Sequence, residues 1–193
     1  MIASMAQKVS SFFVFNDLIQ KKDKKIYSYC FEILFSTVIN LVFVLIVSVI
    51  FNKVPEMFFY LAGFIPLRRV AGGFHAKTHF RCFCTLVVTY SIFLMILSYT
   101  AVHLNCFFFC ILQGLSILFV FIFAPVQNEN RPISKEERKR FQRKSRSMIL
   151  AGCLFSMIII LFSFVYAVSF IIGSFTASLS LLAAQMIQRR GMQ

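Results

Sequence analysis

One short polar stretch, residues 68–82, carries residue types that can perform nucleophilic catalysis. It reads Arg-Arg-Val-Ala-Gly-Gly-Phe-His-Ala-Lys-Thr-His-Phe-Arg-Cys and lies between long apolar segments. A cysteine thiolate with a histidine base can attack a carbonyl carbon and hold the acyl group covalently. Ionisable groups beside membrane-spanning segments usually mark functional sites. We therefore expect the functional site in this polar break.

Cys82 has the local sequence of an activated thiol. Gly72 and Gly73 interrupt any helix that leaves the preceding segment, because glycine permits positive φ and close backbone approach. Thr78 is predicted as the N-cap of the next helix, which would place Cys82 in the first turn of that helix, next to Arg81. A helix N-terminus and a neighbouring cation both favour thiolate over thiol. The pattern predicts Cys82 as a nucleophile.

Two histidines compete for the role of general base. On one continuous helix, His75 would lie about 10 Å from Cys82, too far for proton transfer, so a turn at the glycines must bring it closer. His79 stands three positions before Cys82 and would be its neighbour on a helix. Cys84 would face about 160° away from Cys82 on the same helix. Spacing alone does not decide which of the two histidines is the general base.

The same residues also permit a metal hypothesis. His75 and His79, with Cys82 or Cys84, offer up to three zinc ligands. A zinc protease of the HExxH type needs a glutamate after the first histidine, and Ala76 occupies that position. Residues 61–100 contain no Asp or Glu that could replace it. We therefore expect neither a metal nor another cofactor.

The composition predicts an all-α polytopic membrane protein. Of 193 residues, 59% are hydrophobic and only 14% are charged, whereas soluble domains carry roughly a quarter charged residues. Spanning a bilayer takes about 20 apolar residues. About six segments qualify, with a short second one and a tight turn near Val168 and Ser169 before the last: residues 31–51, 54–67, 83–102, 107–124, 148–167 and 170–187.

Charge predicts the orientation in a cell membrane. With six spans, the basic clusters at 21–25, 68–81, 131–146 and 189–190 fall on one face of the membrane. In the loops on the opposite face, Lys53 is the only Lys or Arg. The positive-inside rule makes that face cytoplasmic, together with both termini and the polar break. The net charge of +13 would attract anionic lipids or an acidic peptide. Nucleic acid is excluded as a partner because no soluble reading domain is present.

Two regions outside the predicted spans are also expected to be helical. Residues 1–29 are expected to form an amphipathic helix at the cytoplasmic face, retained in the mature protein, before a single transmembrane domain over 30–193. A basic cytoplasmic loop, 125–147, contains Ser134 and Glu137 at the spacing of a capping box and so predicts a basic helix. That helix either anchors in lipid headgroups or holds an acidic substrate segment. The candidates for the second role are Arg138, Lys139, Arg140, Arg143 and Lys144.

The polar break and the basic loop together resemble the signature of the accessory gene regulator B (AgrB-type) family of membrane cysteine endopeptidases. The matching residues are Arg68, Gly73, His75, Ala76 and Cys82, followed by Ala124-Pro125, Asn130-Arg131-Pro132-Ile133 and the basic run to Ser147. The resemblance implies an enzyme that cuts a membrane-associated quorum-sensing autoinducer propeptide near its C-terminus. It assigns His75 as base and Cys82 as nucleophile, with an acyl-enzyme that a thiol or hydroxyl of the peptide attacks to form a thiolactone or lactone.

The resemblance further implies a propeptide substrate with an amphipathic N-terminal helix and an acidic C-terminal tail, and an enzyme that is a homodimer. Arg68 or Arg69 would orient a substrate carboxylate or stabilise the oxyanion, with Arg68 favoured by its motif position. Both arginines also suit a simple topological role. Gly72 and Gly73 would shape the backbone.

Two other functions compete with this one. A non-catalytic membrane protein, such as a transporter or assembly partner, would use the break only as a connection. Transport would need polar groups inside the spans, yet the middle parts of the predicted spans hold only Asn40, Gln113 and scattered Ser and Thr. A protease with simple hydrolysis and no ring closure is equally compatible with the sequence. A third catalytic group is not evident, and the acidic candidates are Glu56, Glu129, Glu136 and Glu137.

Overall fold

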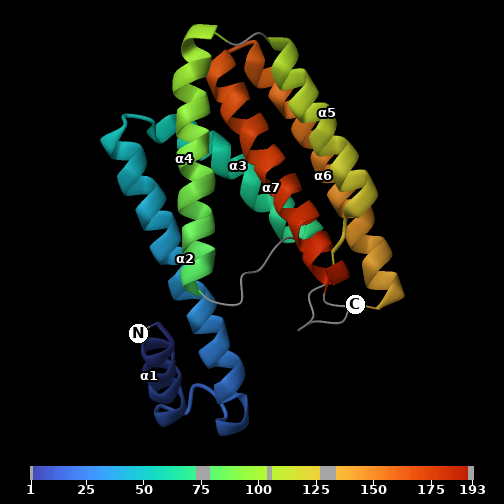
Figure 1. Ribbon diagram of the computed structural model, residues 1–193. Helices are drawn as coiled ribbons and strands as arrows, with labels where there is room; N and C mark the ends of the chain where they lie inside the picture. The colour runs from blue at the N-terminus through green and yellow to red at the C-terminus, as the bar shows by residue number, and fades with distance from the viewer. Residues whose placement is uncertain (1, 73–78, 104–105, 127–133, 191–193) are drawn as a thin grey trace. The chain divides into compact units, whose positions relative to one another are not determined.

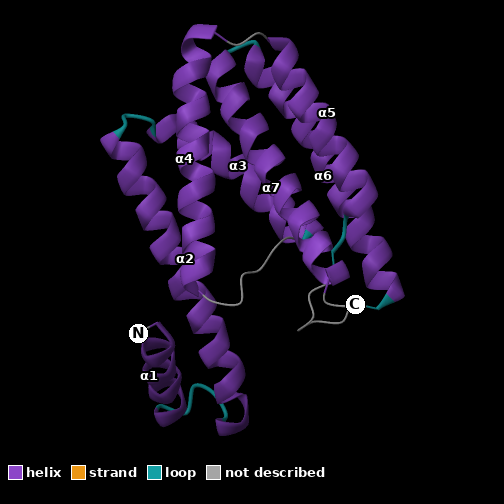
Figure 2. Ribbon diagram, viewed as in Figure 1, coloured by secondary structure: helices purple, strands orange, loops and turns teal. Residues whose placement is uncertain are grey.

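The described part of the chain is helical. The computed structural model describes residues 2–72, 79–103, 106–126 and 134–190, in which there are seven α-helices, one 3-10 helix and no strand (Figures 1 and 2). This confirms the all-α fold class. The helices are α1 (Ile2–Phe15), η1 (Lys21–Asp23), α2 (Lys24–Ile50), α3 (Val54–Ala71), α4 (His79–His103), α5 (Cys106–Phe123), α6 (Lys135–Ile160) and α7 (Phe164–Arg190).

Three helical stretches in the described residues are long and apolar enough to cross a bilayer. They are Lys21–Ile50, Cys106–Phe123 and Phe164–Met186. The apolar part of α4, Cys82–Ser98, is shorter. The protein is therefore an all-α membrane protein, and the full set of six spans with their cytoplasmic orientation stays a prediction.

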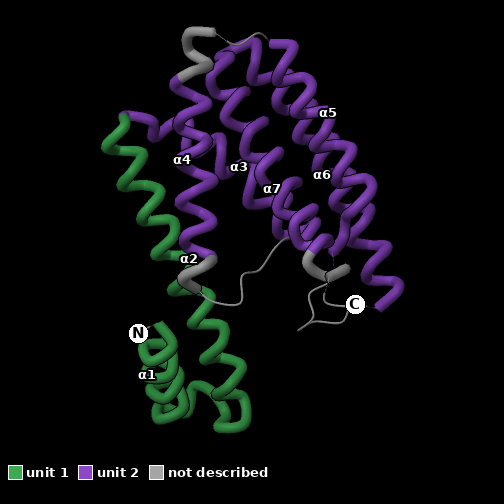
Figure 3. Tube along the Cα trace, viewed as in Figure 1, with its two compact units in different colours: residues 1–51 green, residues 52–193 purple. Residues whose placement is uncertain are grey.

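The chain forms two compact units, residues 1–51 and 52–193 (Figure 3). In the first unit α1 packs along α2, with Ala6 and Ser10 fully buried and the rings of Phe13 and Phe31 5.3 Å apart. The apolar side chains of Phe12 and Phe15 remain exposed. The predicted N-terminal helix is thus present; its place at the membrane surface, like the division into residues 1–29 and 30–193, remains a prediction.

In the second unit, α7 packs against α3, α4, α5 and α6 (Figure 1). Ser169, Gly173 and Ala177 are buried at a spacing of four, which lets helix backbones approach closely. A Cβ on Gly173 would collide with the carbonyl oxygen of Tyr60, and one on Gly63 with that of Phe170. The backbones of α3 and α7 therefore touch where these two glycines lie.

The turn between α6 and α7 is not where the sequence predicted it. Instead of lying near Val168 and Ser169, it lies between Ile160, the last residue of α6, and Phe164, the first of α7. The amides of Phe162 and Ser163 both donate to the carbonyl of Ile159, which closes a tight turn. Ser169 does not break α7 because its hydroxyl donates to the carbonyl of Val165 within the helix.

Successive helices of the second unit run in opposite directions, so the C-terminal ends of α3 and α5 and the N-terminal ends of α4 and α6 lie at one end of it (Figure 1). At the start of α6, the Glu137 amide donates to Ser134 Oγ at 3.2 Å and the Ser134 amide donates to Glu137 Oε2 at 3.0 Å. This confirms the predicted capping box. The polar break and the basic loop therefore begin at the same end of the unit.

Candidate functional site

Within the polar break, helix α3 ends at a glycine that the backbone requires. Gly72 follows α3 with φ +82°, a conformation that residues with a side chain rarely adopt. A Cβ at this position would also lie 2.8 Å from the carbonyl oxygen of Val126. The Val126 amide donates to the carbonyl of Ala71 at 3.1 Å. The start of the break is thus joined to the chain that leaves α5 towards the basic loop.

Cys82 lies in the first turn of α4, as predicted, because that helix begins at His79. Its thiol is free and half-buried, whereas Cys84, two residues on, is exposed. Thr78, Gly73 and His75 lie outside the described residues. The side chain of His79 also lies outside them, so the choice between the two histidines as base stays a prediction.

The structure distinguishes Arg68 from Arg69. Arg69 is exposed, while Arg68 is half-buried within the second unit. Burial lowers the pKa of the Arg68 guanidinium, whereas the charges of Cys82 and Tyr60 in their ionised forms raise it. A charge on Cys82 would therefore be attracted to the Arg68 guanidinium. A guanidinium held near a thiolate can stabilise both that anion and an oxyanion formed by its attack on a carbonyl.

Phe64 is part of this site and was missed in the sequence. The guanidinium carbon of Arg68 lies 5.2 Å from the centroid of the Phe64 ring, within the range of a cation–π interaction. The two residues are four positions apart on α3 and therefore share a face. That spacing of Phe and Arg was the available signal.

Glu56, one of the acidic candidates for a third catalytic group, is engaged elsewhere. It lies near the start of α3, twelve residues before Arg68, and forms a salt bridge of 3.1 Å with Lys53. Twelve helical residues correspond to about 18 Å along the axis. The structure therefore keeps Glu56 away from the end of α3 where Arg68 lies. Among the described residues, no group of three His, Cys, Asp or Glu side chains could hold a metal ion.

The basic residues of α6 form an exposed surface. Within the described residues no salt bridge joins this surface to an acidic side chain, so its charge is available to a ligand. The helix is fixed to α5 by Arg146, whose Nη2 donates to the carbonyl of Phe121 at 3.1 Å and whose guanidinium lies 5.0 Å from the Phe121 ring. The exposed residues are Arg138, Lys139, Arg140, Arg143 and Lys144.

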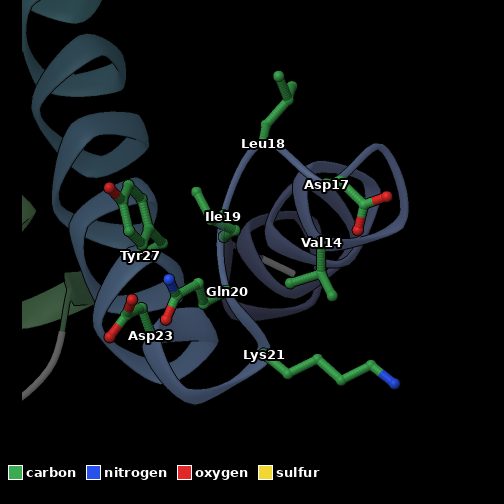
Figure 4. Close-up of a pocket in the computed structure, with 8 residues that line it drawn as sticks. All are labelled: Val14, Asp17, Leu18, Ile19, Gln20, Lys21, Asp23 and Tyr27. Carbon is green, nitrogen blue, oxygen red and sulfur yellow. The ribbon is translucent and has the colours of Figure 1, made fainter.

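A pocket in the first unit contains none of the predicted site residues. It lies at the connection between α1 and α2 (Figure 4) and is lined by Val14, Asp17, Leu18, Ile19, Gln20, Lys21, Asp23 and Tyr27. Asp17 and Asp23 lie on opposite sides of it in this view, so their carboxylates do not converge on one point. The chemistry expected of the chain belongs to the second unit.

Comparison with known proteins identifies the family of the chain. No solved structure matches the chain. An AgrB-like protein of Clostridium beijerinckii is 27% identical over 137 residues, covering 70% of this chain and 68% of that protein. AgrB-like protein 2 of Clostridium perfringens is 30% identical over 157 residues (78% and 71%), and protein FsrB of Enterococcus faecalis is 29% identical over 117 residues (61% and 48%). The family model for accessory gene regulator B matches residues 5–187. The chain therefore belongs to the accessory gene regulator B family, which takes part in quorum sensing.

Proposed function

We propose that this protein is a membrane-embedded cysteine endopeptidase that removes the C-terminal part of a quorum-sensing autoinducer propeptide. The observation that carries the proposal is the position of Cys82 in the first turn of α4, where a thiolate would attract the half-buried guanidinium of Arg68. A helix N-terminus and a guanidinium both stabilise a thiolate. Membership of the accessory gene regulator B family supplies the class of substrate.

In the first step, Cys82 gives its proton to His75 and the thiolate attacks the scissile carbonyl carbon. The carbonyl oxygen takes up the negative charge, and Arg68 stabilises it. His75 then returns the proton to the amide nitrogen as the C–N bond breaks. The C-terminal tail leaves with a new amino group, and the rest of the peptide stays on Cys82 as a thioester.

In the second step, a thiol or hydroxyl within the bound peptide gives its proton to His75 and attacks the thioester carbonyl. The bond to Cys82 breaks, the thiolate returns and a thiolactone or lactone forms. A thioester preserves the acyl group for this nucleophile only where water is kept out. A site at the edge of the membrane would help to exclude that water.

The exposed basic surface of α6 suits the acidic tail of such a propeptide. Charge complementarity mainly raises the rate of association and makes it sensitive to salt. Replacing Arg138, Lys139 and Arg140 together by Gln should lower kcat/KM at low salt and flatten its salt dependence. Replacing Lys21, Lys22 and Lys24, which are equally exposed in the first unit, removes the same charge and is the control. Equal effects of the two triple variants would contradict a specific role for α6.

The decisive experiment is mass spectrometry of the released tail from membranes that carry the protein and its propeptide. Cys82→Ser and His75→Ala should abolish release, whereas Cys84→Ser and His79→Ala should retain it. Normal release from the first pair would end the peptidase proposal in favour of a non-catalytic membrane protein. Loss in all four variants would favour a His/Cys metal site. Ring-closed and linear products differ by the mass of one water, which separates cyclisation from hydrolysis.

A further inference from the structure

Arg68 is turned back along its own helix. Its guanidinium carbon lies over the Phe64 ring at 5.2 Å, and helical side chains lean towards the N-terminus, so a residue at i+4 covers the one at i. Arg69, the next residue, is exposed. An arginine that served only to fix topology would extend its charge towards water and headgroups. Arg68 instead rests on an aromatic face inside the second unit.

Phe64 is itself held by neighbouring rings. It is 8% exposed and stacks on Tyr60, with ring centroids 6.0 Å apart and planes at 9°. Tyr60 is 1% exposed and packs against Phe93 at 4.5 Å and Tyr90 at 5.7 Å. Its hydroxyl makes no hydrogen bond of standard geometry within the described residues, although hydroxyls of neighbouring threonines approach it. Ring packing therefore fixes this column.

The aromatic column joins the two helices that carry the site. Phe93 and Tyr90 belong to α4, the helix whose first turn holds Cys82, whereas Phe64 and Arg68 belong to α3. Phe64 reaches α4 through Tyr60, which stacks on Phe64 and packs against both α4 rings, so the direction of the guanidinium depends on how Tyr60 holds the Phe64 ring. A ring face attracts a guanidinium directionally, whereas an aliphatic side chain of similar size does not.

We infer that Phe64 is a positioning residue, whose ring face sets the direction of the Arg68 guanidinium and thereby its attraction to a thiolate at Cys82. Any effect of Phe64 on catalysis rests on the proposed function. Its effect on the stability of the Cys82 thiolate does not. With the ring removed, Arg68 would be released towards water, as Arg69 already is, and the thiolate would lose a stabilising charge.

The test measures the rate of Cys82 alkylation against pH without substrate, in full-length protein in which the other five cysteines, all of them free thiols, are replaced by Ser. Phe64→Leu should raise the pH midpoint of alkylation by roughly half a unit to one unit. Phe64→Met, a second variant without a ring, should do the same, and Phe64→Tyr should retain the parent midpoint. Phe109→Leu removes an equally buried ring that packs on Phe164 of α7, and it should leave the midpoint unchanged.

A double-mutant cycle separates positioning from general disruption. In an Arg68→Gln background, where the guanidinium is already absent, Phe64→Leu should cause no further shift of the midpoint. An unchanged midpoint in Phe64→Leu, or an equal shift with and without Arg68, would overturn the inference. Since no propeptide is used, these outcomes are independent of tail release. If Phe64→Leu shifts the midpoint as expected but the parent protein releases no tail from a propeptide, the peptidase proposal is overturned and the positioning role stands.

Discussion

The backbone amide of Val126 donates a hydrogen bond of 3.1 Å to the carbonyl oxygen of Ala71. This contact fixes the chain that leaves α5 to the chain that leaves α3. The polar break and the basic loop, which the sequence separates by about fifty residues, therefore start side by side. A propeptide whose tail is held by the basic loop would have its scissile bond near the break.

Gly72→Ala is expected to damage this junction. The residue has φ +82°, and the new Cβ would lie 2.8 Å from the Val126 carbonyl oxygen. With ψ −172°, this backbone lies in a region that essentially only glycine adopts, at a cost of about 1–3 kcal/mol for other residues, so tail release and thermal stability should both fall. Gly114→Ala in α5 is the control, because a Cβ there meets no atom within 4 Å. Thermal unfolding followed by circular dichroism, together with tail release, checks both variants; similar behaviour would contradict the junction.

The α3–α7 crossing should be the part of the fold least tolerant of added volume. A Cβ on Gly173 would collide with the Tyr60 carbonyl oxygen, and backbone atoms cannot move aside as a side chain can. Gly173→Ala should lower the free energy of unfolding by about 1–3 kcal/mol, the usual penalty of overpacking. Gly152→Ala meets only the ring of Phe170 at 3.3 Å and should destabilise less. Unfolding in detergent measures both, and equal losses would argue against backbone contact.

Ser134→Ala should loosen the first turn of α6. The variant removes the acceptor of the Glu137 amide, and loss of a serine N-cap typically costs about 1 kcal/mol. Hydrogen exchange of the Glu137 and Arg138 amides, which donate to Ser134, should accelerate about fivefold as a result. Glu137→Gln can still complete a capping box and should change exchange less. If the two variants exchange alike, the reciprocal cap does not stabilise this helix end.

Local features of the sequence were enough to predict much of the fold. Apolar length predicted the long helices, the Ser134–Glu137 spacing predicted a cap that the structure confirms, and glycine predicted the positive φ at residue 72. The turn between α6 and α7 was misplaced because Leu161 and Phe162, which form it, are as apolar as the helices on either side. No Gly, Pro or charge marks that turn.

In the candidate site too, features set by neighbouring residues could be predicted, whereas features set by contacts between helices could not. The position of Cys82 in a first helical turn follows from the break before it, and the structure confirms it. The distinction between Arg68 and Arg69 was suggested only by the resemblance, because burial depends on which face of α3 meets the other helices. The contacts of Phe64 with Arg68 and of Val126 with Ala71 depend on side-chain direction and chain tracing, which spacing does not encode.

Arg68→Gln should separate activity from stability. Burial lowers the pKa of Arg68 in the folded protein. At pH values between this lowered pKa and the ordinary pKa of arginine, the folded state binds fewer protons than the unfolded state. Within this alkaline window stability rises with pH, and near neutral pH the group is charged in both states and adds no slope. Removing a charge disfavoured by burial should therefore keep or raise the midpoint of thermal unfolding.

Tail release by the same variant should fall about tenfold to a thousandfold, as on loss of an oxyanion-stabilising group. Arg69→Gln, at the exposed neighbour, removes an identical charge and should change release by less than about twofold, as for a screened surface group. Release rates and unfolding midpoints measured on the same preparations decide the matter. A destabilised Arg68→Gln protein with normal kcat would assign Arg68 to the fold, whereas equal losses of release in both variants would reduce its role to bulk positive charge.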